Sequence, residues 1–157
     1  MIFIVRSGIF AFCKVKHVND QMLSETTLAL LKELQLKSHA AYSEGGLLYT
    51  YTEASNQAHF RLPEIMPNTR SGQLAASEGH ELVRFIQASQ GDYASQSVDL
   101  VCVATSRELL HQLESDLNFD EIEWAFEEGG HDMNCALKMA RRSDNCYFSL
   151  ELMWSID

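Results

Sequence analysis

The side chains with the clearest chemical potential are carboxylates, and they are concentrated in the segment Glu114–Asp132. This segment of 19 residues contains eight Asp and Glu residues and no Lys or Arg. Two close pairs, Glu121 with Glu123 and Glu127 with Glu128, could in principle supply a general acid and a general base. Acid–base catalysis requires the two carboxyls to lie in different environments, so that their pKa values are separated. Alternate positions on one strand face share an environment, so the pattern favours a solvated or docking face over a catalytic pair.

Apolar side chains alternate with these acids. Ile122, Trp124 and Phe126 would lie on one face of a strand, with the acids on the other. Tryptophan is enriched in binding hot spots, and carboxylates near it speed the encounter with a basic partner. The alternative is that Trp124 belongs to the core and the acids only solvate the opposite side. The partner-binding residues that we predict are Asp120, Glu121, Glu123, Trp124, Glu127 and Glu128.

The best candidate metal ligands are His131, Asp132 and Cys135, with Cys146 further along the chain. His131 and Cys135 are four residues apart and would share one face of a helix, as zinc ligands can. However, Asp132 is better explained as a helix N-cap and Cys135 as the core of that helix, so we predict no metal site. The six histidines are scattered singly. The chain also has neither a G-x-S-x-G nucleophile motif nor a phosphate-binding glycine loop, so no catalytic residue is predicted.

The charge of the chain is acidic and unevenly distributed. The net charge is −10 over 157 residues. Residues 1–41 carry five Lys or Arg against three Asp or Glu, a balance of +2, so the remainder carries −12. Such a field repels nucleic acids and membrane surfaces, and it favours a basic protein partner. An acidic balance also serves simply to keep soluble proteins dispersed.

The length predicts a single globular domain, 1–157, and no apolar run approaches the ~20 residues of a membrane-spanning helix. The first residues lack the basic region and the cleavage site of a signal peptide, so we expect a cytoplasmic protein. Four widely spaced cysteines do not suggest a disulfide framework. We expect no cofactor, and the composition is compatible with a homodimer.

The elements that would position these residues follow from apolar periodicity. Before residue 90 we expect two helices, over residues 20–36 and 75–89, and the first would have Asp20 as its N-cap. Alternating runs predict strands at Ile2–Val5, Ile9–Val18, Leu47–Thr52 and Ala58–Leu62.

After residue 90 the most apolar run is Val98–Ala104, which is typical of a strand covered on both faces. Thr105 and Glu108 follow directly and match a capping box, which would begin a helix with four leucines facing inward. Residues 120–128 are compatible with a strand or a helix. The strand is favoured, because from residue 121 to residue 127 no acid falls on the apolar side.

The end of the chain predicts a helix and a strand. Gly129 and Gly130 break the chain, Asp132 would cap a short helix through Ala140, and Cys146–Trp154 would form the last strand. The whole pattern predicts an α/β or α+β protein. Its one mixed or mostly antiparallel sheet would have about six strands, with three to four helices.

One stretch of the chain points to a different function. Residues 67–75, Pro-Asn-Thr-Arg-Ser-Gly-Gln-Leu-Ala, lead into a predicted helix and then into the strand Val98–Ala104. The helix after that strand ends at Leu117-Asn118-Phe119. This order resembles GNAT-type N-acetyltransferases. In that family a strand and an R-x-x-G-x-G/A turn present backbone amides to the acetyl-CoA pyrophosphate.

The resemblance implies an acetyl-CoA site at Arg70, Gly72 and Ala75, although Gln73 stands where the first glycine of the turn is expected.

The sequence thus leaves two hypotheses for the function. The first is a small acidic protein of inhibitor or immunity type. It would neutralise a basic partner, such as a nuclease toxin, through the 114–132 segment. The alternative is a divergent acyltransferase that uses acetyl-CoA.

Overall fold

The structure is a computed structural model, and it describes residues 22–54, 70–74 and 79–156. Four sequence predictions lie outside these residues: the strands at Ile2–Val5, Ile9–Val18 and Ala58–Leu62, and the N-cap at Asp20. No helix in the described part of the chain is both long enough and apolar enough to cross a membrane.

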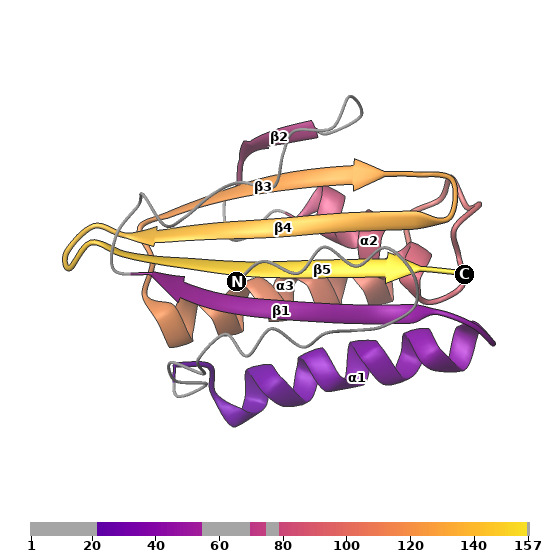
Figure 1. Cartoon of the computed structure of the whole chain (residues 1–157), viewed down its shortest axis with the longest axis horizontal. Coiled ribbons are helices and arrows are strands. Elements are labelled where there is room, and N and C mark those ends of the chain that lie inside the picture. The colour runs from indigo at the N-terminus through magenta and orange to yellow at the C-terminus, as the bar shows by residue number, and fades with distance from the viewer. Residues whose placement is uncertain (1–21, 55–69, 75–78, 157) are drawn as a thin grey trace, which may run out of the picture.

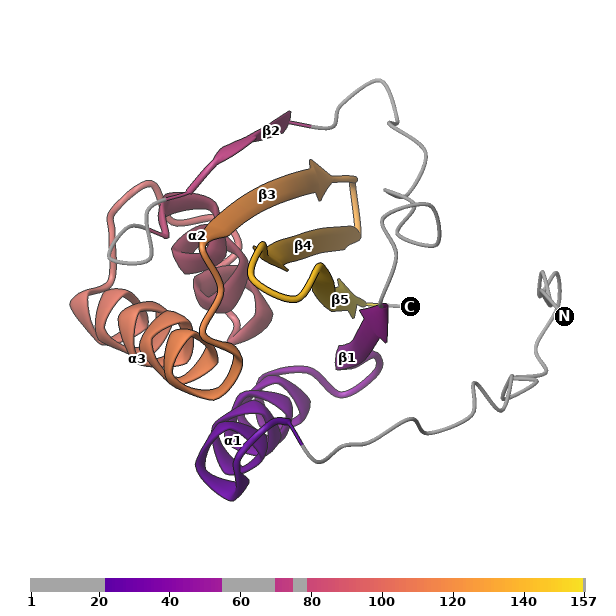
Figure 2. The ribbon, with the colours of Figure 1, turned by 90° about the vertical axis from the view of Figure 1, so that its left-hand side faces the viewer.

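The described residues form one antiparallel sheet of five strands, in the order β1-β5-β4-β3-β2, with three helices on one of its faces (Figures 1 and 2). Of the alternatives predicted from the sequence, the described residues show the α+β class, the antiparallel sheet and three helices, but the described sheet has five strands instead of about six. The elements are α1 (Glu25–Ala41), β1 (Gly46–Ala54), β2 (Arg70–Gln73), α2 (His80–Ser89), α3 (Leu100–Leu117), β3 (Glu121–Glu128), β4 (Asp132–Arg141) and β5 (Cys146–Ser155).

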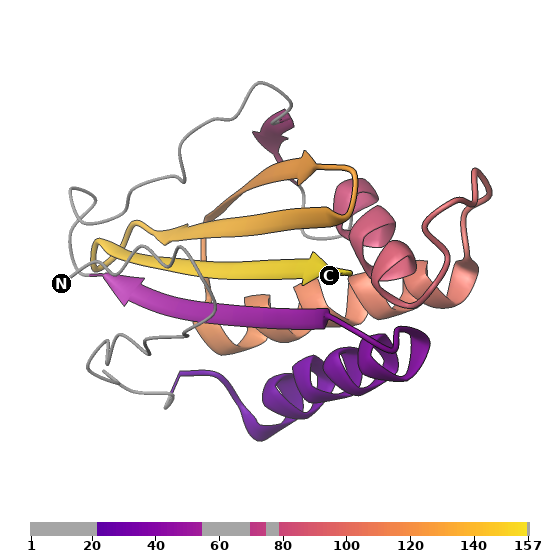
Figure 3. The same cartoon turned by 45° about the vertical axis from the view of Figure 1, so that its right-hand side comes forward.

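Helix α1 begins later than the sequence suggested because Ser24 is its N-cap. The Ser24 hydroxyl accepts a hydrogen bond from the amide of Thr27, at 3.3 Å. Asp116 of α3 adds a tertiary cap. Its Oδ2 accepts from the Ser24 amide at 2.8 Å and from the Thr27 hydroxyl at 2.6 Å. These contacts fix the start of α1 against α3, and the two helices lie side by side under the sheet (Figure 3).

The strand predicted at Val98–Ala104 is wrong, because α3 begins within it. Asp99 is the N-cap, and its carboxylate accepts from the amide of Val101 at 2.8 Å. Val101 is 63% exposed, whereas Cys102 is 2% exposed and belongs to the buried stripe of the helix. The capping box at Thr105 does not form either, since Thr105 donates its hydroxyl to the carbonyl of Val101, one turn back in α3.

The helix predicted from Asp132 to Ala140 is also wrong, because this segment forms the strand β4. Ala136 and Ala140 are apolar on the face that points away from the helices, and they hide the alternation that marks a strand. The side chains of β4 that face the helices are Met133, Cys135, Leu137 and Met139, each at most 1% exposed.

The core lies between the helices and the facing side of the sheet. Strand β5 crosses its centre, and its helix-facing residues Phe148, Leu150, Leu152 and Trp154 are all buried. The Trp154 ring is sandwiched between aromatic neighbours, since its centroid lies 5.2 Å from that of Tyr42 and 5.6 Å from that of Tyr93. Helix α2 packs between β4 and α3 and closes one end of this core (Figure 2).

Candidate functional site

Strand β3 divides the predicted binding residues between the two faces of the sheet. The predicted strand over residues 120–128 is confirmed as Glu121–Glu128. Trp124 pairs with Leu137 of β4 on the helix-covered face. Glu121, Glu123 and Glu127 alternate with these positions, so they lie on the helix-free face. The acids and the aromatic residue therefore flank the same strand on opposite sides.

The helix-free face carries more carboxylates than cations. Glu121, Glu123 and Glu127 lie in a row along β3, and Glu151 lies on β5. Lys138 of β4 sits opposite Glu123 and is 8% exposed. Burial lowers the pKa of the Lys138 ammonium group, and the nearby Glu151 and Glu123 oppose that shift. The strands of the described sheet contribute five acids to this face, the fifth being Asp132 at the start of β4.

The three acids of β3 on this face differ in their exposure. Glu121 is exposed and binds Arg142 through both oxygens, at 2.7 Å to Nη2 and 3.2 Å to Nε. An exposed ion pair of this kind contributes little to the stability of the fold. Glu123 is exposed as well, whereas Glu127 is half-buried. All three carboxylates thus lie on one strand face, and the most accessible are at the end near Glu121.

The other two predicted acids make contacts that hold the fold together. Asp120 accepts a hydrogen bond from the backbone amide of Arg142 at 2.6 Å, which ties the start of β3 to the β4–β5 turn. Glu128 forms an ion pair with Arg84 of α2 at 3.1 Å. The Arg84 guanidinium also lies 5.4 Å from the centre of the Tyr93 ring. Asp120 and Glu128 therefore have structural partners within the chain.

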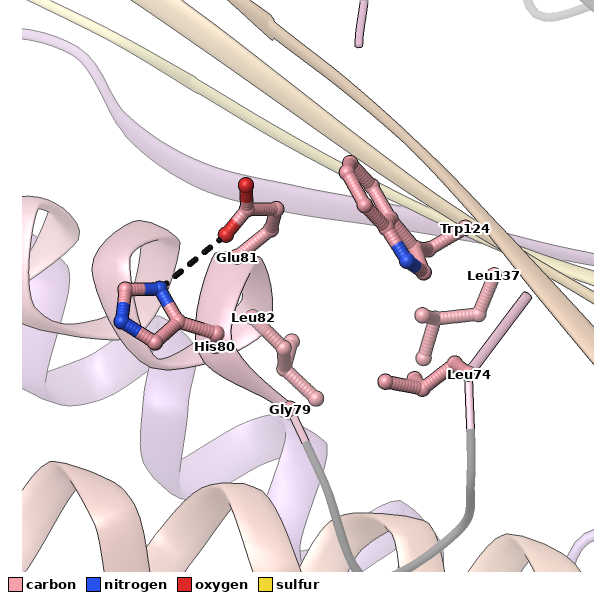
Figure 4. Close-up of a pocket in the computed structure, with 7 residues that line it drawn as sticks. All are labelled: Leu74, Gly79, His80, Glu81, Leu82, Trp124 and Leu137. Atoms are coloured by element: carbon pink, nitrogen blue, oxygen red, sulfur yellow. Dashed lines mark hydrogen bonds and ion pairs between the residues drawn. The ribbon is translucent and has the colours of Figure 1, made fainter. Parts of the chain in front are cut away.

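Trp124 is half-buried and lines a hollow of about 280 Å³ between β3 and the start of α2 (Figure 4). The first turn of α2 forms the opposite wall with Gly79, His80, Glu81 and Leu82. Apolar surface comes from Leu74, Leu82 and Leu137. This hollow, which we call the Trp124 pocket, is lined by residues from both the helix layer and the sheet.

The polar group of the Trp124 pocket is the Glu81 carboxylate, whose side chain is only 15% exposed. Its Oε2 lies 3.2 Å from Nδ1 of His80, and the imidazole of His80 is 91% exposed. Figure 4 shows Glu81 and Trp124 on opposite sides of the hollow. The indole packs over Gly72 of β2, because a Cβ added at Gly72 would lie only 3.3 Å from the indole Nε1. A glycine at this position lets the ring lie flat against the edge strand.

Sequence reasoning did not identify Gly72, His80 and Glu81 as partners of Trp124. Glu81 falls within the helix predicted over residues 75–89, but no local pattern shows that its carboxylate faces β3. Gly72 was singled out only as a possible cofactor contact. The one available signal was Gly72 itself, since a glycine in an edge strand often marks a close approach by another group.

A larger hollow of about 480 Å³ lies between α2 and the first half of α3. It shares Gly79 and His80 with the Trp124 pocket, and Val98 stands at its edge, 57% exposed. Among its described lining residues is none of the binding residues predicted from the sequence. The Trp124 pocket and the acidic row of β3 are therefore the candidate site.

No group of three or more His, Cys, Asp or Glu side chains in the described residues is arranged to hold a metal ion. Because Asp132 begins a strand, His131 and Cys135 do not share the helical face that the sequence suggested. Burial raises the pKa of the Cys135 thiol to about 12, and the charge of Glu81 adds to this shift. Cys135 is therefore a core thiol of low reactivity.

The segment that resembles the acetyl-CoA turn has a different structure. Arg70 and Gly72 lie within the edge strand β2, while Ala75 is outside the described residues. The strand that should follow the first helix is the beginning of α3. In the described residues, a helix therefore stands where the resemblance expects the strand over 98–104.

Comparison of the chain with protein-family models, with curated proteins and with solved structures finds no match.

Proposed function

We propose that this protein is a small acidic binding protein of inhibitor or immunity type, which neutralises a basic protein partner such as a nuclease toxin. Binding would use the helix-free face of β3. The observation that carries the proposal is the row of carboxylates at Glu121, Glu123 and Glu127. These side chains stand on a regular strand, so their spacing is fixed before any partner arrives.

The chemistry of this row suits recognition of a cationic surface. Carboxylates on a rigid face increase the association rate with a positively charged partner and exclude negatively charged competitors. They can occupy the places of phosphate groups on a surface that binds nucleic acid. The row does not supply two carboxyls in contrasting environments, which an acid–base mechanism would need.

The experiment that tests the proposal is affinity capture from a lysate of the source organism at low salt, with bound proteins identified by mass spectrometry. One bait is the wild-type chain, and the second carries Glu121→Gln, Glu123→Gln and Glu127→Gln. A third bait controls for net charge alone. It carries Glu33→Gln, Glu44→Gln and Glu108→Gln, at exposed positions that lie outside the sheet and outside the 114–132 segment.

We expect a basic protein to be held by the wild type and by the charge control, and to be lost from the β3 variant. The β3 variant should unfold at nearly the same urea concentration as the wild type, since exposed charges contribute little to stability. Equal capture by all three baits, or capture only of acidic proteins, would contradict the proposal.

A further inference from the structure

The geometry points to a second contact with the same partner: the Trp124 pocket receives one Lys or Arg side chain of that basic protein. This inference rests on the proposed function and names the chemical group that the protein recognises. Three properties of the pocket carry it: its size, the pairing of an aromatic ring with a carboxylate, and its position on the strand that bears the acidic row.

The size of the pocket fits one side chain. Its volume of about 280 Å³ lies just below the range of about 300–1,000 Å³ that is typical of sites for drug-sized ligands. Leu74, Leu82 and Leu137 supply apolar surface for a methylene stem. Lys and Arg bury such stems against apolar surface while their charged ends reach a polar group.

The polar lining fits a cation. The Glu81 carboxylate, 15% exposed, stands across the hollow from the indole of Trp124 (Figure 4). An indole face attracts ammonium and guanidinium groups, and a half-buried carboxylate attracts them more strongly than a solvated one. His80 stands at the exposed edge, where its ring meets Glu81. The carboxylate would repel a negatively charged group, and a neutral polar group would lack the charge that the ring and the carboxylate attract.

The position of the pocket joins it to the proposed binding surface. Trp124 and Glu123 are consecutive residues of β3, so the pocket and the acidic row lie on opposite faces of the same strand. Strand β2 covers the edge of β3 along Glu123–Phe126, and the amide of Leu74 donates to the carbonyl of Ile122, so the edge beside Trp124 is occupied by β2. A partner that covers the row along β3 and extends around β2 can place a side chain beside Trp124 on the other face of the sheet.

The pocket can be tested without the partner, by NMR of the two indole N–H groups. Trp124→Phe assigns the Trp124 signal, and the buried Trp154 provides an internal reference. The probes are butylguanidinium, its neutral isostere butylurea, and the peptide N-acetyl-Gly-Arg-Gly-amide. The proteins are the wild type, Glu81→Gln, and Glu108→Gln as a control for lost charge at an exposed site on α3.

We expect butylguanidinium and the peptide to shift the Trp124 signal in a saturable way and to leave the Trp154 signal unchanged. Butylurea should bind at least about fivefold more weakly, because it lacks the charge that the ring and the carboxylate attract. Glu81→Gln should reduce this preference to below about twofold, whereas Glu108→Gln should preserve it. Thermal unfolding of each variant shows that the loss is not due to a disrupted fold.

Three outcomes would overturn the inference: no shift with either cation, equal affinity for butylurea, or a preference that survives Glu81→Gln. Binding of butylguanidinium but not of the peptide would also overturn it, since the pocket would then take a small free cation and not a side chain of a protein. None of these results bears on the acidic row. If the β3 variant failed to capture the partner but the pocket bound no cation, the proposed function would still be supported and only this inference would be wrong.

Discussion

The substitution Val101→Asp separates the observed helix from the strand that the sequence suggested. In the structure Val101 lies in the first turn of α3 and is 63% exposed. Full burial of a valine side chain stabilises a protein by about 1.5–3 kcal/mol, so the partial burial here contributes about 0.5–1 kcal/mol. A carboxylate in the first turn of a helix returns about 0.3–1 kcal/mol, and the helix propensities of Val and Asp are similar. The expected change in the free energy of unfolding is therefore within about 1 kcal/mol of zero.

The assay is equilibrium unfolding in urea, followed by circular dichroism. The matched control is Leu110→Asp on the same helix, where the native side chain is fully buried. An unpaired carboxylate at that position should cost several kcal/mol and leave little folded protein. If Val101→Asp destabilised the protein by more than about 3 kcal/mol, the start of α3 would be wrongly placed and the run 98–104 would belong to the core.

Three further results are expected. Asp116→Ala should lower the free energy of unfolding in urea by about 1–3 kcal/mol, because the start of α1 loses both hydrogen bonds that the Asp116 carboxylate accepts. A decrease of less than about 0.5 kcal/mol would show that this tertiary cap is unimportant. Gly79→Ala should lower the melting temperature, because the new methyl group would collide with the Ser106 hydroxyl, and adding Ser106→Ala should restore part of the loss. Failure of this rescue would show that the clash is not the cause. Finally, burial, assisted by Asp99, raises the pKa of Cys102 to about 11, and that of Cys135 is about 12. Both thiols are protonated below these values, so at pH of about 8 they should resist a thiol-specific disulfide reagent in the native state and react on unfolding. Mass spectrometry locates the labelled cysteines, and rapid labelling of either thiol in the native state would contradict its burial.

The parts of the fold that the sequence predicted correctly are those with an unmixed period. From Glu121 to Glu127, strand β3 places every acid on one face and the large apolar residues on the other, which favoured a strand over the helix that this segment also allowed. The C-terminal half of α3 was also predicted, because Leu109, Leu110, Leu113 and Leu117 form a helical stripe, and all four are fully buried.

The parts that were predicted wrongly have apolar residues on both faces. In the run 98–104, exposed Val and Leu side chains stand next to the buried Cys102, so hydrophobicity alone indicated a buried strand. Asp99, a favourable N-cap directly before the helix, was the signal that could have corrected this prediction. In β4 the alanines of the helix-free face made a strand resemble an apolar helix.

The candidate site was predicted in part. The acidic row and Trp124 follow from the sequence because they belong to one strand, and alternation assigns their faces. Glu81 could not be predicted, because its place across the hollow from Trp124 depends on how α2 packs against the sheet, which brings together residues 43 positions apart. Such contacts leave no period in the sequence.

The most direct test of the central proposal is the rate at which the captured basic partner associates with this protein. It would be measured for the wild type, the β3 triple variant and the charge control, at about 0.05 M and about 0.5 M salt. If the row at Glu121, Glu123 and Glu127 attracts the partner, the wild-type association rate should fall steeply with salt. The β3 variant should associate slowly at both concentrations, and the charge control should resemble the wild type. An association rate that depends neither on salt nor on these three carboxylates would contradict the proposal.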